Sequence, residues 1–219
     1  MATVVAKGTS VAVIVPTAIM GTIHNRKNAN VDLRAAAIVG GIGAFTAATA
    51  HYFLESSTPF SVWIAIAAAG IAGLLASLIH AFAAVTLNAD QTVSGTGINL
   101  LATGGTTFLA QIIFKMERTA PFKLGMMPGA GGIYPTAWIA LVIVVIAWFL
   151  LYRRPFGMRL RACGEHPQAA ASAGIDVRKT RYIAVMASGL LAGIAGGCLV
   201  LTQTMQYSIY TINGAGFIA

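Results

Sequence analysis

The sequence predicts an all-α, polytopic transmembrane helix bundle of about six spans, with one short helix outside the membrane. Composition gives the first reason: of 219 residues, 57% are hydrophobic and only 9% are charged, whereas about 25% charged residues are usual in soluble domains. A mean hydropathy of +0.78 is the second, and the grouping of apolar residues into long runs is the third. Too few charges remain to cover a water-facing surface. The composition therefore excludes a soluble enzyme, a disordered tail and a nucleic-acid-binding module, despite a formal net charge of +8.

Six apolar runs define the expected spans, since about 20 residues cross a bilayer as a helix. The runs lie near 8–23, 35–53, 61–86, 96–114, 134–152 and 183–202, and we expect them to form one domain over residues 1–219. The first run is the weakest because it is short and contains Pro16. A half-span or a kinked helix is the alternative there.

Basic residues set the expected orientation, because positively charged loops stay in the cytoplasm. Segment 153–182 holds seven of the fourteen lysines and arginines. Counting six spans from this segment places ten basic residues inside and four outside, with the N-terminus outside. We therefore expect a multi-pass protein of a cytoplasmic membrane, surrounded by lipid, with 153–182 facing the cytoplasm.

Small residues recur at every fourth position along three of the runs. One row is Ala65, Ala69, Gly73, Ser77 and Ala81; a second is Ala36, Gly40, Ala44 and Ala48; a third is Gly189, Gly193 and Gly197. Such rows allow helix backbones to approach closely in a membrane. They predict tight packing within a compact bundle.

Polar residues form a stripe along one face of the fourth run. Its members are Asn99, Thr103, Thr107 and Gln111, with Thr106 beside them. Unpaired polar groups are costly in lipid, so the stripe is expected to face protein or water. Two interpretations stay open: hydrogen bonding between helices, and the lining of a path for a polar, uncharged solute. No acidic residue lies deep in an expected span, which disfavours an ion-coupled secondary carrier.

A short exposed helix is expected within 153–182. Pro167 suits the first helical position, where its missing N–H costs nothing, and Gly174 suits a left-handed stop. Glu165 precedes this helix, where its negative charge favours the positive end of the helix dipole. The helix is alanine-rich and has little to bury by itself. It is either a docking element for a groove on a partner or a solvated connection.

Two long stretches carry an extended pattern. Residues 156–177 read F-G-x-x-x-R-A-x-G-E-x-P-x-A-A-x-x-x-G-I-[DN]-V, and R-Y-x-A and a G-L-L-A-G-x-A-G span follow. Residues 80–102 read H-A-x-x-x-V-x-L-x-A-[ND]-Q-x-V-S-G-x-x-[IL]-N-L-L-A. Both patterns resemble the membrane permease subunits of bacterial ABC importers of the branched-chain amino acid, ribose and nucleoside type. Within that group the likeness is greatest to the simple-sugar and nucleoside permeases that work with basic-membrane-protein lipoproteins.

The resemblance implies a transport subunit, not an enzyme, that imports a nucleoside or a simple sugar. It implies a second permease subunit, identical or different, a cytoplasmic ABC ATPase that binds the exposed helix, and an extracytoplasmic solute-binding protein. The residues that it places in the ATPase-coupling segment are Arg159, Arg161, Gly164, Glu165, His166, Pro167, Ala169, Ala170, Gly174, Ile175 and Asp176. The chain has no G-x-x-x-x-G-K-[ST] loop, so ATP and Mg²⁺ are expected in the partner ATPase. No cofactor and no metal are expected in this chain.

Two departures from the family pattern support an alternative. Asp32 and Arg34 stand where the family usually has glycine and glutamate, and the family continues with further spans past the G-x-G-F-I-A phrase on which this chain ends. The chain therefore looks C-terminally truncated. A truncated, non-transporting permease relic is the first alternative, and an ion-coupled secondary carrier is the less favoured second.

Overall fold

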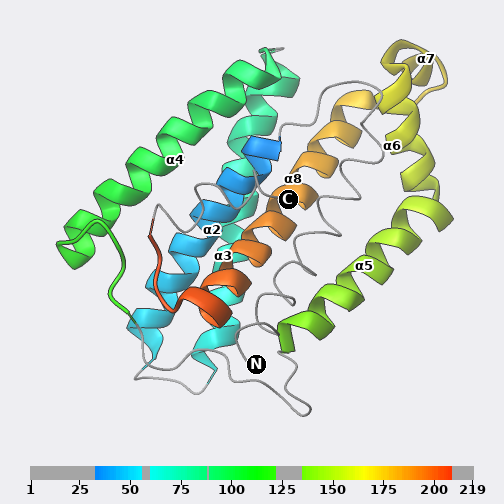
Figure 1. The fold of residues 1–219 in the computed structure, drawn as a ribbon. Helices are drawn as coiled ribbons and strands as arrows, with labels where there is room; N and C mark the ends of the chain where they lie inside the picture. The colour runs from blue at the N-terminus through cyan, green and yellow to red at the C-terminus, as the bar shows by residue number, and fades with distance from the viewer. Residues whose placement is uncertain (1–32, 56–59, 88, 122–134, 209–219) are drawn as a thin grey trace.

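The computed structural model describes residues 33–55, 60–87, 89–121 and 135–208, and these ranges are almost entirely helical (Figure 1). The α-helices are α2 (Leu33–Leu54), α3 (Ser61–Ala81), α4 (Gln91–Phe114), α5 (Pro135–Arg153), α6 (Pro155–Glu165), α7 (Pro167–Ser172) and α8 (Val177–Leu199). π-Helical turns extend α3 and α8, namely η1 (Phe82–Thr86) and η3 (Val200–Thr204). The all-α class predicted from the sequence is confirmed.

Four of the described helices are long and apolar enough to cross a membrane. They are Ser61–Thr86, Val93–Phe114, Pro135–Arg153 and Val177–Thr202. Fewer candidate spans are therefore seen than the six expected, for two reasons. Segment 8–23 lies outside the described residues, and run 35–53 forms α2, whose side chains are described only from Val39 to Leu54, a stretch too short to be assessed as a span.

Helices α2, α3 and α8 pack together as the centre of the bundle (Figure 1). The α3 and α8 backbones are in direct contact: a Cβ added at Gly73 would collide with the carbonyl oxygen of Gly189, and one at Gly193 would collide with that of Ala69. Between α2 and α8, a Cβ at Gly43 would lie 2.5 Å from the carbonyl oxygen of Gly193. Residues without side chains on α8 thus bring all three backbones together.

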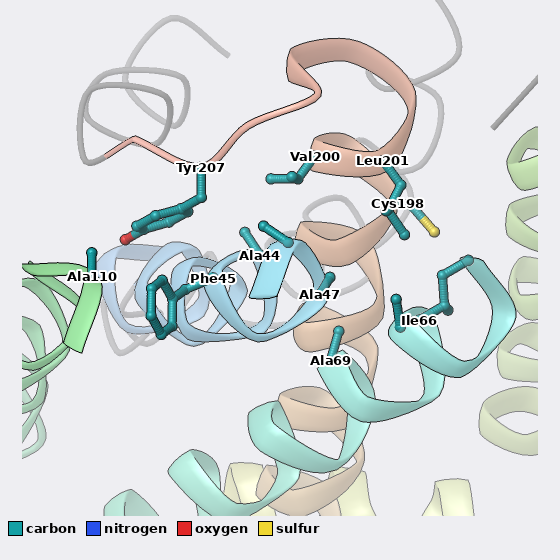
Figure 2. Packing of buried hydrophobic residues seen from close by; sticks show 12 residues of the cluster. Ala44, Phe45, Ala47, Ile66, Ala69, Ala110, Cys198, Val200, Leu201 and Tyr207 are labelled. Carbon is teal, nitrogen blue, oxygen red and sulfur yellow. The ribbon is translucent and has the colours of Figure 1, made fainter. Parts of the chain in front are cut away.

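Larger buried side chains gather where α8 passes into η3 (Figure 2). Val200 and Leu201 are fully buried there, and Tyr207 is 3% exposed. The Tyr207 ring meets Phe45 of α2 edge to face, with 5.4 Å between the ring centroids. The strand-like segment after η3 therefore crosses over α2 toward α4.

Helices α4 and α5 lie at the sides of this centre (Figure 1). The face of α4 toward α2 carries Ala102, Thr106 and Ala110, all buried. Within the described ranges, α5 packs chiefly against α6, and its buried residues are Thr136 and Ala140.

Segment 153–182, which was expected to be a loop with one short helix, is mostly helical. It contains α6, α7 and the first turns of α8. The helix that contains the expected span 183–202 begins earlier than that run, at Val177. Proline occupies the first position of both α6 and α7, where it costs no hydrogen bond within the helix that it begins, and Asp176 caps α8.

Candidate functional site: a docking segment at one end of the bundle

Helix α7 begins and ends where its sequence dictates. Pro167 is its first residue, and Gly174 has a φ of 79°, in the left-handed region that favours glycine. The amide of Ile175 donates to the carbonyl of Ala170 at 3.1 Å, and that of Gly174 donates to Ala171 at 3.0 Å. This pair of bonds is the Schellman arrangement, which satisfies carbonyls at a helix end. The short helix is therefore closed at both ends by local chemistry.

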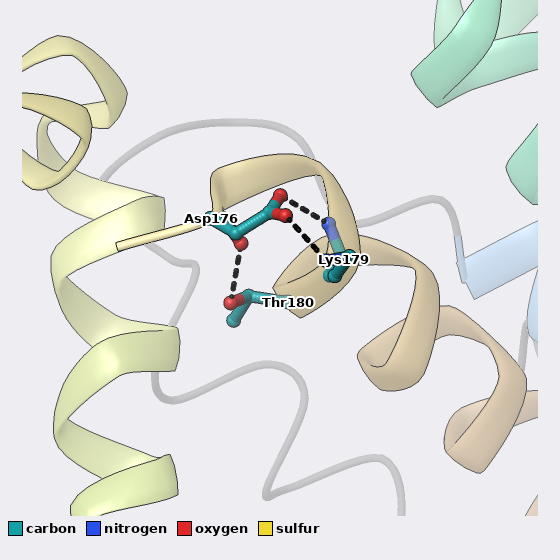
Figure 3. Close-up of polar contacts among 3 residues, drawn as sticks. All are labelled: Asp176, Lys179 and Thr180. Carbon is teal, nitrogen blue, oxygen red and sulfur yellow. Dashed lines mark hydrogen bonds and ion pairs between the residues drawn. The ribbon is translucent and has the colours of Figure 1, made fainter. Parts of the chain in front are cut away.

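The start of α8 is fixed by an N-cap (Figure 3). The Asp176 carboxylate accepts a hydrogen bond from the Lys179 amide at 3.0 Å and pairs with the Lys179 ammonium at 3.2 Å. The Thr180 hydroxyl donates to the Asp176 carbonyl at 2.8 Å. The hydrogen bond from the Lys179 amide is the main reason that the pKa of Asp176 lies below its ordinary value. Asp176, which was expected to belong to an ATPase-coupling segment, is thus a helix cap.

Most of the residues expected to couple the chain to an ATPase are open to solvent. Exposed are Arg159, Gly164, Glu165, His166, Ala169, Gly174 and Asp176; half-buried are Arg161, Pro167 and Ile175; buried is Ala170. Ala170, at 3% exposure, faces the body of the protein, while Ala169 and Ala171 face away from it. Helix α7 therefore presents a smooth outer face of small side chains.

This end of the bundle also gathers chain segments that are distant in sequence. Thr86 in η1 is hydrogen-bonded to the Tyr182 hydroxyl in α8, and His80 Nδ1 in α3 lies 3.1 Å from the Ser94 hydroxyl in α4. The end of α3, the start of α4 and the start of α8 therefore lie together, on the side that α7 occupies (Figure 1). The two stretches that carried the family pattern, 80–102 and 156–177, both have residues at this end of the bundle (Figure 1).

Arginines at the junction of α5 and α6 lie over aromatic rings. The guanidinium of Arg153 is 5.9 Å from the ring centroid of Trp148, and that of Arg154 is 5.2 Å from Phe149. The Arg161 guanidinium is 4.2 Å from the Tyr152 ring. Aromatic residues beside arginines are typical of the membrane–water interface. These pairs were not predicted from the sequence, although the aromatic residues shortly before Arg153 and Arg154 were a signal for them.

The polar stripe of α4 is only partly buried. Asn99, Thr103 and Thr107 are half-buried, Thr106 is buried and Gln111 is exposed. The threonine hydroxyls donate to carbonyls of their own helix: Thr103 to Asn99 at 2.8 Å, Thr106 to Ala102 at 2.7 Å and Thr107 to Thr103 at 2.7 Å. Thr106 also lies 3.1 Å from the Tyr207 hydroxyl. Within the described residues, the stripe thus makes one hydrogen bond to a distant segment. Thr106, which lies beside the line of the other four residues, makes that bond.

The small residues singled out in the sequence lie in the bundle centre. On α3, Ala65, Ala69, Gly73 and Ser77 are buried, and on α8 so are Gly189, Gly193 and Gly197. In the described part of the chain there is no group of three or more histidine, cysteine, aspartate or glutamate side chains that could hold a metal ion.

Comparison with protein families gives one match over nearly the whole chain. Residues 8–219 match the model of the permease component of branched-chain amino acid transport systems. Both stretches of the extended pattern fall inside this range.

Curated relatives match over most of the chain. The guanosine ABC transporter permease protein NupQ of Bacillus subtilis is 40% identical, over 95% of this chain and 70% of its own length. The nucleoside ABC transporter permease protein NupC of Lactococcus lactis is 34% identical, over 87% of this chain and 64% of its own length. The putative glucose ABC transporter permease protein TsgC13 of Haloferax volcanii is 33% identical, over 87% of this chain and 59% of its own length. The chain thus spans between 59% and 70% of the length of these relatives. No solved structure matches the chain.

Proposed function

Because the chain belongs to the family of permease components of branched-chain amino acid transport systems, we propose that it is the membrane-spanning permease subunit of an ATP-driven importer whose solute is a nucleoside. The observation that carries the choice of solute is the 40% identity to a guanosine permease over 95% of this chain. A nucleoside permease is also the second relative, at 34% identity. The putative glucose permease, at 33%, makes a simple sugar the competing solute.

The composition of α4 supports a neutral, hydroxylated solute. Its stripe offers amide and hydroxyl groups without a fixed charge, through Asn99, Thr103, Thr107 and Gln111. Such groups form hydrogen bonds with sugar hydroxyls and base edges, and they do not select an ion. The stripe is proposed as part of the solute path, with Thr106 holding the helix against Tyr207.

The exposed face of α7 supports an ATPase partner. A helix of small side chains, closed at both ends and set on the surface, fits into a groove of another protein. The seven basic residues of 153–182 favour the cytoplasmic side for this segment. We propose that a cytoplasmic ABC ATPase, which supplies ATP and Mg²⁺, docks there in a bacterial cytoplasmic membrane. A second permease subunit and an extracytoplasmic binding protein complete the proposed assembly.

The test is solute uptake by cells that lack their own nucleoside importers. The chain is produced with the ATPase, the second permease and the binding protein that are encoded with it, and entry of tritiated guanosine, ribose and leucine is followed. We expect ATP-dependent uptake of guanosine that excess unlabelled nucleoside suppresses. Uptake of ribose in its place would assign a sugar, uptake that follows an ion gradient without ATP would assign a secondary carrier, and no uptake of any solute would favour a non-transporting subunit.

Two variants sharpen this assay. Glu165→Arg combined with Ala169→Asp changes the exposed surface at the end of α6 and on α7 and should abolish co-purification of the ATPase. Asn99→Leu combined with Gln111→Leu should abolish uptake while the ATPase still co-purifies. Unchanged uptake in the second variant would remove the stripe from the solute path.

A further inference from the structure

Helix α5 ends with a carbonyl that its own helix cannot satisfy. In an α-helix the carbonyl of Leu151 would accept from the amide four residues on, but that residue is Pro155, which has no N–H. The carbonyl accepts instead from the Arg161 guanidinium, whose Nη2 lies 3.0 Å away. One side chain of α6 thus replaces the hydrogen bond that proline removes from α5.

The same junction is closed by a backbone contact. Gly157 is buried, and a Cβ added there would overlap the carbonyl oxygen of Leu151 and lie 2.6 Å from its Cα. The Arg161 guanidinium also lies over the Tyr152 ring, with its Cζ 4.2 Å from the ring centroid. Arg161 is therefore held from two sides, by Leu151 and by Tyr152. A planar group with several donors can make both contacts at once, and the compact ammonium of lysine matches this geometry less well.

Helix α6 is in turn joined closely to the docking helix. A single residue, His166, separates α6 from α7, and hydrogen bonds run across it: its amide donates to Ala162 at 3.1 Å, and its carbonyl accepts from Ala170 at 3.0 Å. Cys163 on α6, at 1% exposure, and Ala170 on α7 face the body of the protein. Helices α6 and α7 therefore form one bent unit, and the unit also packs against α8.

The junction between α5 and α6, from Leu151 to Arg161, is called the elbow. We propose that Arg161 is a positioning residue that holds this elbow in one geometry, so that a displacement of α7 carries α5 with it. Helix α5 packs against the other described helices chiefly through this elbow, which makes the elbow its main mechanical link to the docking segment. The proposal rests on the proposed function for the source of the displacement, since a bound ATPase supplies it. The geometry of the elbow itself does not depend on that function.

The first experiment measures the elbow without any transport. Spin labels are placed at Val145→Cys on α5 and Gln168→Cys on α7, two exposed sites, with Cys163 and Cys198, which are buried, replaced by alanine. We expect a narrow distance distribution between the labels by pulsed electron resonance, a broad one in Arg161→Met, which keeps an unbranched apolar stem without the donors, and an intermediate one in Arg161→Lys. Arg181→Met removes an exposed charge from α8 and should leave the distribution narrow.

The second experiment measures coupling in the assembled transporter in lipid vesicles. In Arg161→Met the ATPase should still co-purify and hydrolyse ATP, while guanosine moved per ATP falls by about tenfold, a size typical of coupling between distant sites. Arg161→Lys should be intermediate and Arg181→Met should match the parent.

The outcomes separate the two proposals. A narrow distribution and a parental transport ratio in Arg161→Met would overturn the elbow proposal. Loss of ATPase capture in Arg161→Met would also overturn it, because Arg161 would then belong to the docking surface. Absence of guanosine uptake in the parent would count against the proposed function alone, and the label distances would still decide the elbow.

Discussion

The centre and the sides of this bundle both contain strongly apolar helices, yet they pack very differently. In the apolar part of α3, 39% of the residues are buried, and in that of α8, 28%. The corresponding shares are 17% for α4 and 11% for α5. Helices α3 and α5 are both strongly apolar, so apolarity does not explain the difference. In lipid it cannot, because a neighbouring helix is no more apolar than a lipid tail.

Side-chain size at the contact explains the difference better. Where α3 meets α8, residues such as Gly73 and Gly193 bring backbone against backbone, which maximises dispersion contacts. Helix α5 presents large side chains, including Trp138 and Val145, which are more than half exposed. The sides have smaller contacts. Helix α4 packs the buried Ala102 and Ala110 against α2 and adds the hydrogen bond between Thr106 and Tyr207, and α5 is joined to α6 where Arg161 and Gly157 meet Leu151. The molecule thus combines a closely packed centre with two helices that are attached over smaller areas.

The largest effect is expected from a substitution in the centre formed by α2, α3 and α8. Gly193→Ala places a methyl group against the carbonyl of Ala69 and the Cα of Gly73, where both neighbours are backbone and cannot rotate away. Overpacking of this kind costs about 1–3 kcal/mol, so we expect the fraction of protein that survives heating in detergent, measured by size-exclusion chromatography, to fall at lower temperature.

The matched control is the same substitution on α4. Gly104→Ala meets no atom within 4 Å, and alanine is favoured over glycine in helices by about 1 kcal/mol. The control should be neutral or stabilising. An equal loss of heat-surviving protein in the two variants would contradict the distinction between centre and side.

A smaller effect is expected where the side joins the centre. Tyr207→Phe keeps the ring against Phe45 but removes the hydroxyl that meets Thr106. A double-mutant cycle with Thr106→Val should give a coupling of about 0.5–1.5 kcal/mol, the net value of one hydrogen bond. The cycle is needed because Thr106 also donates to its own helix. Additive losses, measured by the same heating assay, would show that packing alone holds α4.

The sequence predicted those features that depend on local rules. The run 61–86 matches the span Ser61–Thr86, and Pro167 and Gly174 bound α7 because both residues act on their own backbone. Helix α6 was missed because its arginines and two glycines give it the composition of a loop. The first turns of α8 were missed for a similar reason, since Arg178, Lys179 and Arg181 are basic but lie on a helix.

Contacts between distant residues could not be read from spacing. Thr106 and Tyr207 are 101 positions apart, and nothing in either neighbourhood indicates the other. The stripe on α4 was drawn through Thr103 and Thr107, but the buried member is Thr106, one helical position to the side. A helical period identifies a face, whereas the partner helix decides which edge of that face is covered.

The smallest effect is expected at the cap of α8, because the centre holds this helix along its length. Asp176→Ala removes the acceptor of the Lys179 amide, so only the first turn should loosen, seen as faster hydrogen exchange at 178–180. Asp176→Asn keeps a capping oxygen and is the control. Because the pKa of Asp176 is lowered in the folded chain, the charged cap stabilises at neutral pH and is lost as the pH falls through that lowered pKa. The parent should therefore approach the alanine variant only in acid. Exchange that spreads along α8 to Gly193 would show that the cap, and not the glycine row, holds the helix, and it would overturn the comparison between centre and sides.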